Sequence, residues 1–148
     1  MNHESSIMNL EGDLVPQAYA EMPLVQRAHV LAKRIYQETK HFPREELYGL
    51  TSQLRRASAS VPANICEGKG HRNDKELYRY LCIARASLAE VLYLLFFAKD
   101  VGLLPASTYR ELFLIADEVG RMLVGLQKYL RGNMALRRTP PKRGCPNS

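Results

Sequence analysis

The sequence predicts an all-α protein, an antiparallel up-down-up-down four-helix bundle. Two observations favour this class. Apolar residues recur at spacings of three and four along four segments, which is the periodicity of amphipathic helices, and short polar connections separate these segments. We find no hairpin turn signal between alternating residues. Four amphipathic helices joined by short connections are typical of an up-and-down bundle.

The 148 residues are about the length of one domain, and their composition divides them into three parts. Residues 1–22 are polar and lack sustained periodicity, so we expect a flexible N-terminal arm with a short helical turn near Leu14–Tyr19. Residues 23–131 hold the four helices. Residues 132–148 are rich in proline and charge, which predicts a basic tail that is disordered when alone.

Turn and capping residues place the ends of the helices. Asn73, followed by Glu76, is typical of a helix N-cap. Gly102 and Gly132 suit helix C-termini because glycine readily adopts left-handed backbone angles. We therefore expect helices over residues 23–40, 47–70 and 73–100, and a fourth that follows Pro105, has a capping box of Thr108 and Glu111 and ends at Gly132.

The second predicted helix, residues 47–70, is expected to lie in the middle of the bundle. Its apolar face includes small residues such as Ala57 and Ser58, which allow close approach by neighbouring helices. Pro62 lacks a backbone donor, so we expect a kink or a restart of the helix there.

This helix also carries a family resemblance. The sequence TSQLRRASASVPANICEG resembles the signature of a bacterial four-helix-bundle family, and the likeness continues through KELYRYLCIARASLAEV and VGRMLVGLQKYL. The family includes proteins encoded in intervening sequences of large-subunit ribosomal RNA genes and the accessory variability determinants of diversity-generating retroelements. The resemblance spans residues 24–130. It implies the bundle fold and, as in some members, a ring of five subunits.

An apolar surface on the third predicted helix also favours self-association. Residues 91–98, VLYLLFFA, are apolar nearly all round, and a helix of this kind is buried on more than one side. Nothing in a monomeric bundle covers its outer surface. We therefore expect Tyr93, Phe96 and Phe97 to lie in an interface of a homo-oligomer, which the resemblance implies is a pentamer.

The charge of the chain favours a polyanionic partner. The net charge is +6, but residues 1–22 contain four carboxylates and no lysine or arginine, so the rest carries +10. A basic body favours RNA or DNA as partner and, second, an anionic membrane surface. The alternative is a solvated surface that keeps the protein soluble.

The candidate nucleic-acid contacts are basic residues of the second and third helices and of the tail. They are Arg55, Arg56, Lys69, His71, Arg72, Lys75, Arg79, Arg137, Arg138, Lys142 and Arg143. Arg72, Lys75 and Arg79 have the spacing of one helix face, across which a phosphate backbone could lie. A solvated face is the alternative interpretation.

Arg55 and Arg56 belong to the family signature and diverge by about 100° around a helix of 3.6 residues per turn. We expect a structural role for at least one of them, through a carboxylate such as Glu90 or Glu67 or through a neighbouring subunit. The sequence also places Glu67 one turn after Asn64, where the two could bridge to a neighbouring helix.

The sequence offers no catalytic centre, and we expect neither enzymatic activity nor a cofactor. A carboxylate such as Glu67 needs a second titratable group for acid–base chemistry, and none is evident. The histidines and cysteines lack metal-ligand spacing, and EGKGHRND does not match a P-loop. Three scattered cysteines, no signal peptide and no uncharged run of about 18 apolar residues favour a cytoplasmic protein without membrane contact.

These observations predict a non-enzymatic, oligomeric nucleic-acid-binding accessory protein. The resemblance, the basic charge and the apolar segment EVLYLL favour an accessory variability determinant. Such a protein is expected to bind reverse transcriptase and its RNA and to support mutagenic cDNA synthesis. The alternative is an interaction module of the ribosomal RNA intervening-sequence type, with no established chemistry.

Overall fold

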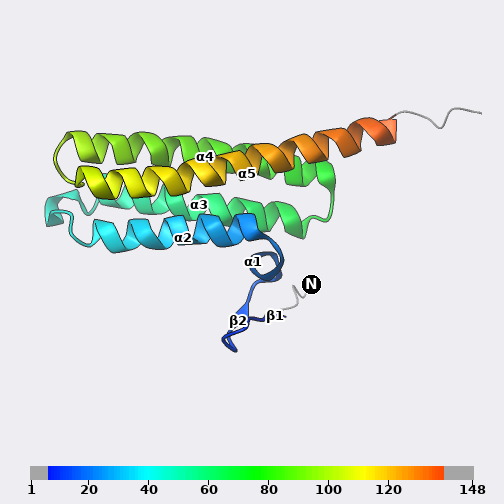
Figure 1. Ribbon diagram of the computed structural model, residues 1–148, viewed down its shortest axis with the longest axis horizontal. Coiled ribbons are helices and arrows are strands. Elements are labelled where there is room, and N and C mark those ends of the chain that lie inside the picture. Colours follow the sequence, from blue (N-terminus) through cyan, green and yellow to red (C-terminus); the bar gives the residue numbers. More distant parts are fainter. Residues whose placement is uncertain (1–6, 139–148) are drawn as a thin grey trace, which may run out of the picture.

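The computed structural model describes residues 7–138, and its helices confirm the all-α class (Figure 1). Two short strands and a short helix precede the long helices, and a 3-10 helix connects two of them. The elements are β1 (Ile7–Met8), β2 (Leu14–Val15), α1 (Gln17–Glu21), α2 (Pro23–Thr39), the 3-10 helix η1 (Arg44–Glu46), α3 (Leu50–Gly70), α4 (Asp74–Asp100) and α5 (Ala106–Arg138).

The four long helices, α2 to α5, lie side by side and are called the helical body below (Figure 1). Helix α3 contacts both α2 and α4, and α5 also contacts α2 and α4. Each helix of the body therefore has two helical neighbours. The small α1 packs against α2 and α3, on the side away from the α4–α5 pair.

A single apolar core fills the space between these helices. Leu31 of α2, Leu54 of α3, Leu81 of α4 and Leu123 of α5 are all fully buried. Burial of one leucine side chain stabilises a fold by about 1.5–3 kcal/mol, so positions of this kind hold the helices together. The apolar periodicity of the sequence arises from these positions.

Helix α3 makes the close contacts that its small residues predict. Ala57 and Ser58 are buried. At Gly68, an added Cβ would lie only 2.7 Å from Cβ of Tyr80 on α4, so the two backbones can approach this closely only with glycine here. The helix runs without a break through Pro62, and the expected restart is wrong. Helix α3 begins at Leu50, three residues later than expected.

The ends of α4 agree with the sequence prediction. The side chain of Asn73 accepts hydrogen bonds from the backbone N–H groups of Lys75 (2.9 Å) and Glu76 (3.3 Å). After α4, Gly102 adopts a φ of +82°, the left-handed conformation that favours glycine.

Helix α5 is longer than the sequence predicts. It continues through Gly132 to Arg138, which corrects the expected end of the bundle at residue 131. One glycine costs a helix only about 1 kcal/mol, and Met134, Ala135 and Leu136 are good helix formers. Residues 139–148 of the predicted tail, with Lys142 and Arg143, lie outside the described residues.

The N-terminal arm is partly ordered by local contacts that the sequence analysis missed. Strands β1 and β2 form an antiparallel pair, although no hairpin was expected. The Oδ1 atom of Asn9 accepts hydrogen bonds from the N–H groups of Glu11 and Asp13, and Gly12 has a φ of +86°. Each strand is too short to show alternation. Helix α1 follows and is attached to the body, since Gln26 of α2 donates a hydrogen bond to the carbonyl of Tyr19.

Helix α4 is also apolar enough, by length and composition alone, to cross a membrane. A core helix of a soluble protein passes the same test, and α4 packs against α3 and α5 along its buried face. Its exposed apolar residues are therefore described below as a surface of the helical body.

Candidate nucleic-acid interface

Basic side chains from three helices gather at one end of the helical body. We call this surface the basic end. It comprises Lys69, His71, Arg72, Lys75 and Arg79, from the end of α3 to the start of α4, together with Arg131, Arg137 and Arg138 of α5. All eight side chains are exposed.

Two contacts bring the end of α5 to the start of α4. Nη1 of Arg137 lies 3.4 Å from Oδ2 of Asp74, a buried oxygen that has no hydrogen bond within residues 7–138. Six residues earlier in α5, Nη2 of Arg131 donates a 2.9 Å hydrogen bond to the hydroxyl of Tyr78. The structure therefore joins Arg137 and Arg138, predicted as part of a tail, to the basic residues of α4.

Tyr80 of α4 organises the centre of the basic end. Its hydroxyl donates a 3.0 Å hydrogen bond to Oε1 of Glu67 on α3. The ring of His71 stacks on it, with centroids 5.3 Å apart, and the guanidinium carbon of Arg79 lies 4.5 Å from its centroid. The expected bridge between helices is thus confirmed for Glu67. Tyr80 is already covered by two side chains, which leaves less of its ring for stacking on a base.

The guanidinium of Arg79 is charged and already forms an ion pair. Nη2 of Arg79 lies 3.1 Å from Oε2 of Glu76, one turn earlier in α4. The hydrogen bond to Glu76, and a smaller contribution from Tyr80, raise the pKa of the Arg79 guanidinium above its ordinary value. Arg79 therefore remains a cation at all physiological pH values, but the carboxylate of Glu76 partly neutralises its charge.

Arg72 does not lie on the face of α4, which corrects the expected row of three residues. Helix α4 begins at Asp74, and Arg72 sits in the turn before it with a φ of +52°, an unusual conformation for a residue other than glycine. Its N–H donates a hydrogen bond to the carbonyl of Lys69. Only Lys75 and Arg79 keep the predicted one-turn spacing.

The carboxylates at this end are all occupied, whereas several cations are free. Glu67 accepts from Tyr80, Asp74 faces Arg137, and Glu76 pairs with Arg79. At the basic end, four lysine and arginine side chains make no hydrogen bond or ion pair within residues 7–138: those of Lys69, Arg72, Lys75 and Arg138. The surface therefore presents uncompensated positive charge to solvent.

The signature arginines lie elsewhere and differ from each other. Nε of Arg55 donates a 2.9 Å hydrogen bond to Oγ1 of Thr39, and its guanidinium carbon lies 4.8 Å from the centroid of the Tyr36 ring. Arg55 thus connects α3 to α2, which confirms a structural role for one of the two arginines, but its partners are a hydroxyl and a ring and not Glu67 or Glu90. Arg56 is exposed and has no such partner among residues 7–138. It lies 13 residues before Lys69, about 20 Å along the helix.

At the opposite end of the α4–α5 pair, aromatic side chains are exposed. We call this surface the aromatic end. It comprises the predicted interface residues Tyr93, Phe96 and Phe97, which are 63%, 45% and 43% exposed, with Tyr109 and Phe113 of α5. Neighbouring rings contact one another from Tyr93 to Phe97 and from Phe96 through Tyr109 to Phe113. The two α5 residues were not predicted, because only the packing of α5 on α4 reveals them.

No group of three or more histidine, cysteine, aspartate or glutamate residues among residues 7–138 is placed to hold a metal ion. The buried amide of Gln127 bridges Arg85 and the sulfur of Cys82, with distances of 2.8 and 3.2 Å, which serves packing of α5 on α4.

Comparison with known proteins shows a family match and similarity to solved structures. Residues 20–125 match the family described as 23S rRNA-intervening sequence protein. A solved structure, a protein of unknown function from the S23 ribosomal protein family of Bacteroides thetaiotaomicron, has a similar fold with a TM-score of 0.64. It is 19% identical and covers 71% of this chain and 98% of its own. No curated protein matches.

Proposed function

Because the chain belongs to the family of 23S rRNA-intervening sequence proteins, we propose that it is a non-enzymatic, oligomeric nucleic-acid-binding accessory protein. The observation that carries this proposal is the basic end, where every described carboxylate is occupied and Lys69, Arg72, Lys75 and Arg138 are free. Free, exposed cations can each approach one phosphate. Release of the counterions of these phosphates supplies the binding free energy.

One further feature of the basic end favours a phosphate backbone. Tyr80 holds His71 and Arg79 against its ring, which reduces the number of conformations that these side chains lose on binding.

Self-association would multiply these contacts. In the proposed assembly, the helical body is an antiparallel four-helix bundle, and copies join through Tyr93, Phe96 and Phe97 into a ring, by family resemblance a pentamer. The exposure of these rings supports the proposal, since contiguous apolar patches are typical of interfaces. Several basic ends on one particle would bind one nucleic acid with an affinity far above that of a single subunit.

Two versions of this function differ in the protein partner. In the first, the protein is the accessory variability determinant of a diversity-generating retroelement and binds reverse transcriptase and its RNA in the cytoplasm. The basic charge and the exposed apolar segment around Tyr93 support it. In the second, it is an interaction module of the ribosomal RNA intervening-sequence type. A reverse transcriptase gene and a template repeat beside the coding sequence would favour the first, and a location inside a ribosomal RNA gene the second.

The proposal is tested by removing charge from the basic end. The variant Arg72→Gln, Lys75→Gln, Arg79→Gln should bind structured RNA at least tenfold more weakly, with a flatter salt dependence. The matched control is Lys40→Gln, Arg44→Gln, Arg110→Gln, which removes three exposed cations from the other end of the body. Equal losses of RNA affinity in both variants would show that binding depends on net charge alone, and would contradict a defined interface.

A further inference from the structure

A groove runs along the outer seam between α4 and α5. It has a volume of about 520 Å³, and its floor is formed by Ala89, Leu92, Gly120, Val124 and Gly125. An added Cβ at Gly125 would meet no atom within 4 Å, so the groove is open at this position. These five residues are small or apolar, which suits an inserted apolar side chain.

Part of the rim of the groove carries net positive charge. Lys128 and Arg85 line it, together with an ion pair between Arg121 and Asp117 at 3.3 Å. Arg85 is held by a hydrogen bond to the buried Gln127, and Lys128 has no partner within residues 7–138. The uncompensated charge favours a ligand that combines apolar side chains with carboxylates.

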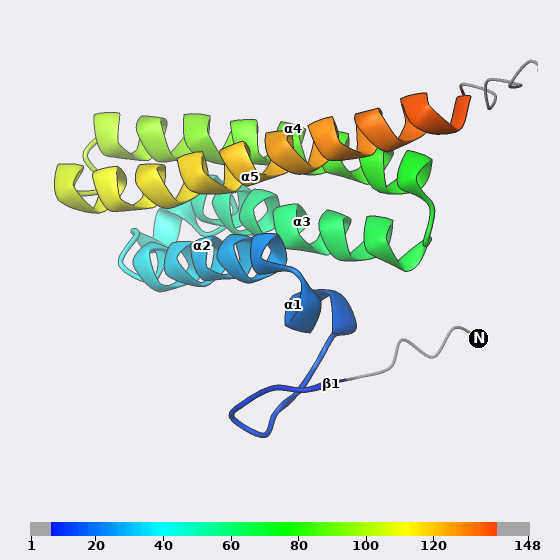
Figure 2. The ribbon, with the colours of Figure 1, turned by 45° about the vertical axis from the view of Figure 1, so that its right-hand side comes forward.

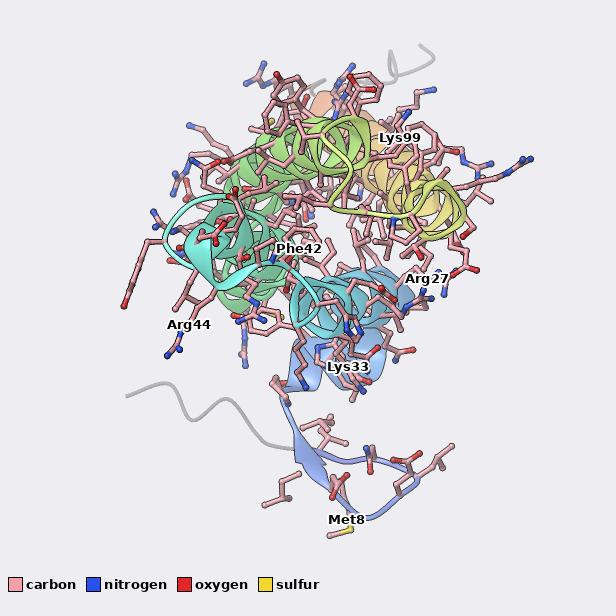
Figure 3. All side chains as sticks on the ribbon, turned by 90° about the vertical axis from the view of Figure 1, so that its left-hand side faces the viewer. Met8, Arg27, Lys33, Phe42, Arg44 and Lys99 are labelled. Atoms are coloured by element: carbon pink, nitrogen blue, oxygen red, sulfur yellow. The ribbon has the colours of Figure 1, made fainter. Side chains whose placement is uncertain are left out.

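The β1–β2 hairpin of this chain has that combination. Its apolar side chains Met8, Leu10 and Leu14 are 65%, 109% and 73% exposed, so its own helical body does not cover them. Glu11 and Asp13 lie between them, and residues 7–22 contain no lysine or arginine. Figure 2 shows the hairpin projecting from the body, and in Figure 3 Met8 lies well apart from the helices.

We infer that the hairpin of one copy docks into the α4–α5 groove of a second copy, with Leu10 on its apolar floor and Glu11 and Asp13 toward Lys128 and Arg85. This inference rests on the proposed self-association and names a contact through which it occurs. An isolated hairpin with two residues per strand is marginal in water, and burial in a neighbour supplies the contacts it lacks. The acidic arm also compensates the basic body of its neighbour.

Geometry directs the hairpin to another copy instead of its own groove. Its anchor, α1, packs against α2 and α3, whereas the groove lies on the α4–α5 side. The nine residues of the hairpin would span about 30 Å when extended and about half of that when folded. Two layers of helices are about 20 Å thick, so a hairpin that remains folded cannot pass around its own body.

Photo-cross-linking of the full chain tests the docking. A benzoylphenylalanine in place of Leu10 should, on irradiation of a mixture of isotope-labelled and unlabelled protein, join peptides of α4 and α5 near Leu92 and Val124 in a different copy. The variant Gly125→Tyr should fill the groove without a clash in its own body and reduce the cross-link at least tenfold. The matched control Gly132→Tyr, two turns further along α5 and also in open space, should leave it unchanged.

Sedimentation of the same samples separates this inference from the proposed function. Oligomers that persist and bind RNA, while Leu10 cross-links only to its own copy, to the aromatic end or to RNA, would overturn the docking and leave the proposed function in place. A protein that sediments as a monomer would overturn both the docking and the proposed assembly. Equal cross-linking in Gly125→Tyr and Gly132→Tyr would also contradict the groove as the site.

Discussion

The two ends of the α4–α5 pair present opposite surfaces. At the basic end, carboxylates are used in local pairs and cations are left over, as at Lys69 and Arg138. At the aromatic end, rings remain exposed, and the cation Lys99 lies 5.0 Å from the centroid of the Phe96 ring. The difference indicates that packing of the apolar core does not account for the exposed side chains of either surface. Free cations suit a hydrated polyanion, whereas stacked exposed rings suit a dry contact between proteins.

The largest expected effect concerns the aromatic end. The variant Tyr93→Asp, Phe97→Asp should weaken self-association by roughly 100-fold or more, because aromatic residues dominate interface energies and buried carboxylates are costly. Sedimentation equilibrium measures the dissociation constant. Leu47→Asp, Tyr48→Asp is the matched control, because it changes two exposed apolar residues at the same end of the helical body that are not part of the aromatic end. If the first variant leaves the assembly unaffected, the interface lies elsewhere, and the assignment of the aromatic end to a contact between proteins is contradicted.

The next effect concerns the support of the basic end. Gly68→Leu should destabilise the fold by about 1–3 kcal/mol, since even its Cβ would lie 2.7 Å from Cβ of Tyr80. Gly132→Leu, in open space on α5, should be neutral or slightly stabilising. Urea unfolding monitored by circular dichroism measures both. Equal stability of the two variants would show that α3 and α4 can separate here and that the basic end is not a rigid surface.

Smaller effects are expected at the signature arginines, which lie at neither end. Arg55→Ala should cost about 1 kcal/mol of stability, because it removes the hydrogen bond to Thr39 and the contact with Tyr36. Arg56→Ala should change stability by less than about 0.5 kcal/mol. The same urea titrations apply. A larger loss at Arg56 than at Arg55 would reverse the assigned roles.

The smallest effect sharpens the electrostatic account of the basic end. Glu76→Gln removes the carboxylate that pairs with Arg79, so the pKa of Arg79 should fall toward its ordinary value while the residue stays charged. RNA affinity should rise a few-fold at low salt, because one more cation becomes available to phosphate. Glu45→Gln, an exposed carboxylate of η1 remote from this end, should have a smaller effect. A weaker complex in Glu76→Gln would show that the pair orients Arg79 for binding.

Regular features of the fold could be predicted from the sequence. The apolar periodicity located α2, α4 and most of α3 and α5, and Asn73 and Gly102 marked the ends of α4, because these signals are local. Local signals failed in two situations. In one, the free-energy cost of a glycine or proline in a helix was outweighed by the rest of the helix, and in the other the element was too short to show a pattern. One glycine did not end α5, Pro62 did not interrupt α3, and the β1–β2 pair was too short to show a pattern.

The candidate site was predictable in composition but not in arrangement. Sequence clustering found Lys69 to Arg79, yet it assigned Arg72 to the face of a helix. The joining of Arg137 to the start of α4 needs the packing of two helices that are distant in sequence. For the same reason the sequence analysis missed Arg131, which only its place in the last turns of a basic helix could have suggested.

The most direct test of the account is a salt titration of binding to structured RNA and to duplex DNA, measured side by side. The four free lysine and arginine side chains of the basic end predict that the logarithm of the association constant falls against the logarithm of salt concentration with a slope of about −3 to −4 for each bound basic end. A difference between the two ligands would identify the preferred nucleic acid. A slope near zero, or no binding at low salt, would contradict the basic end as a phosphate-binding surface.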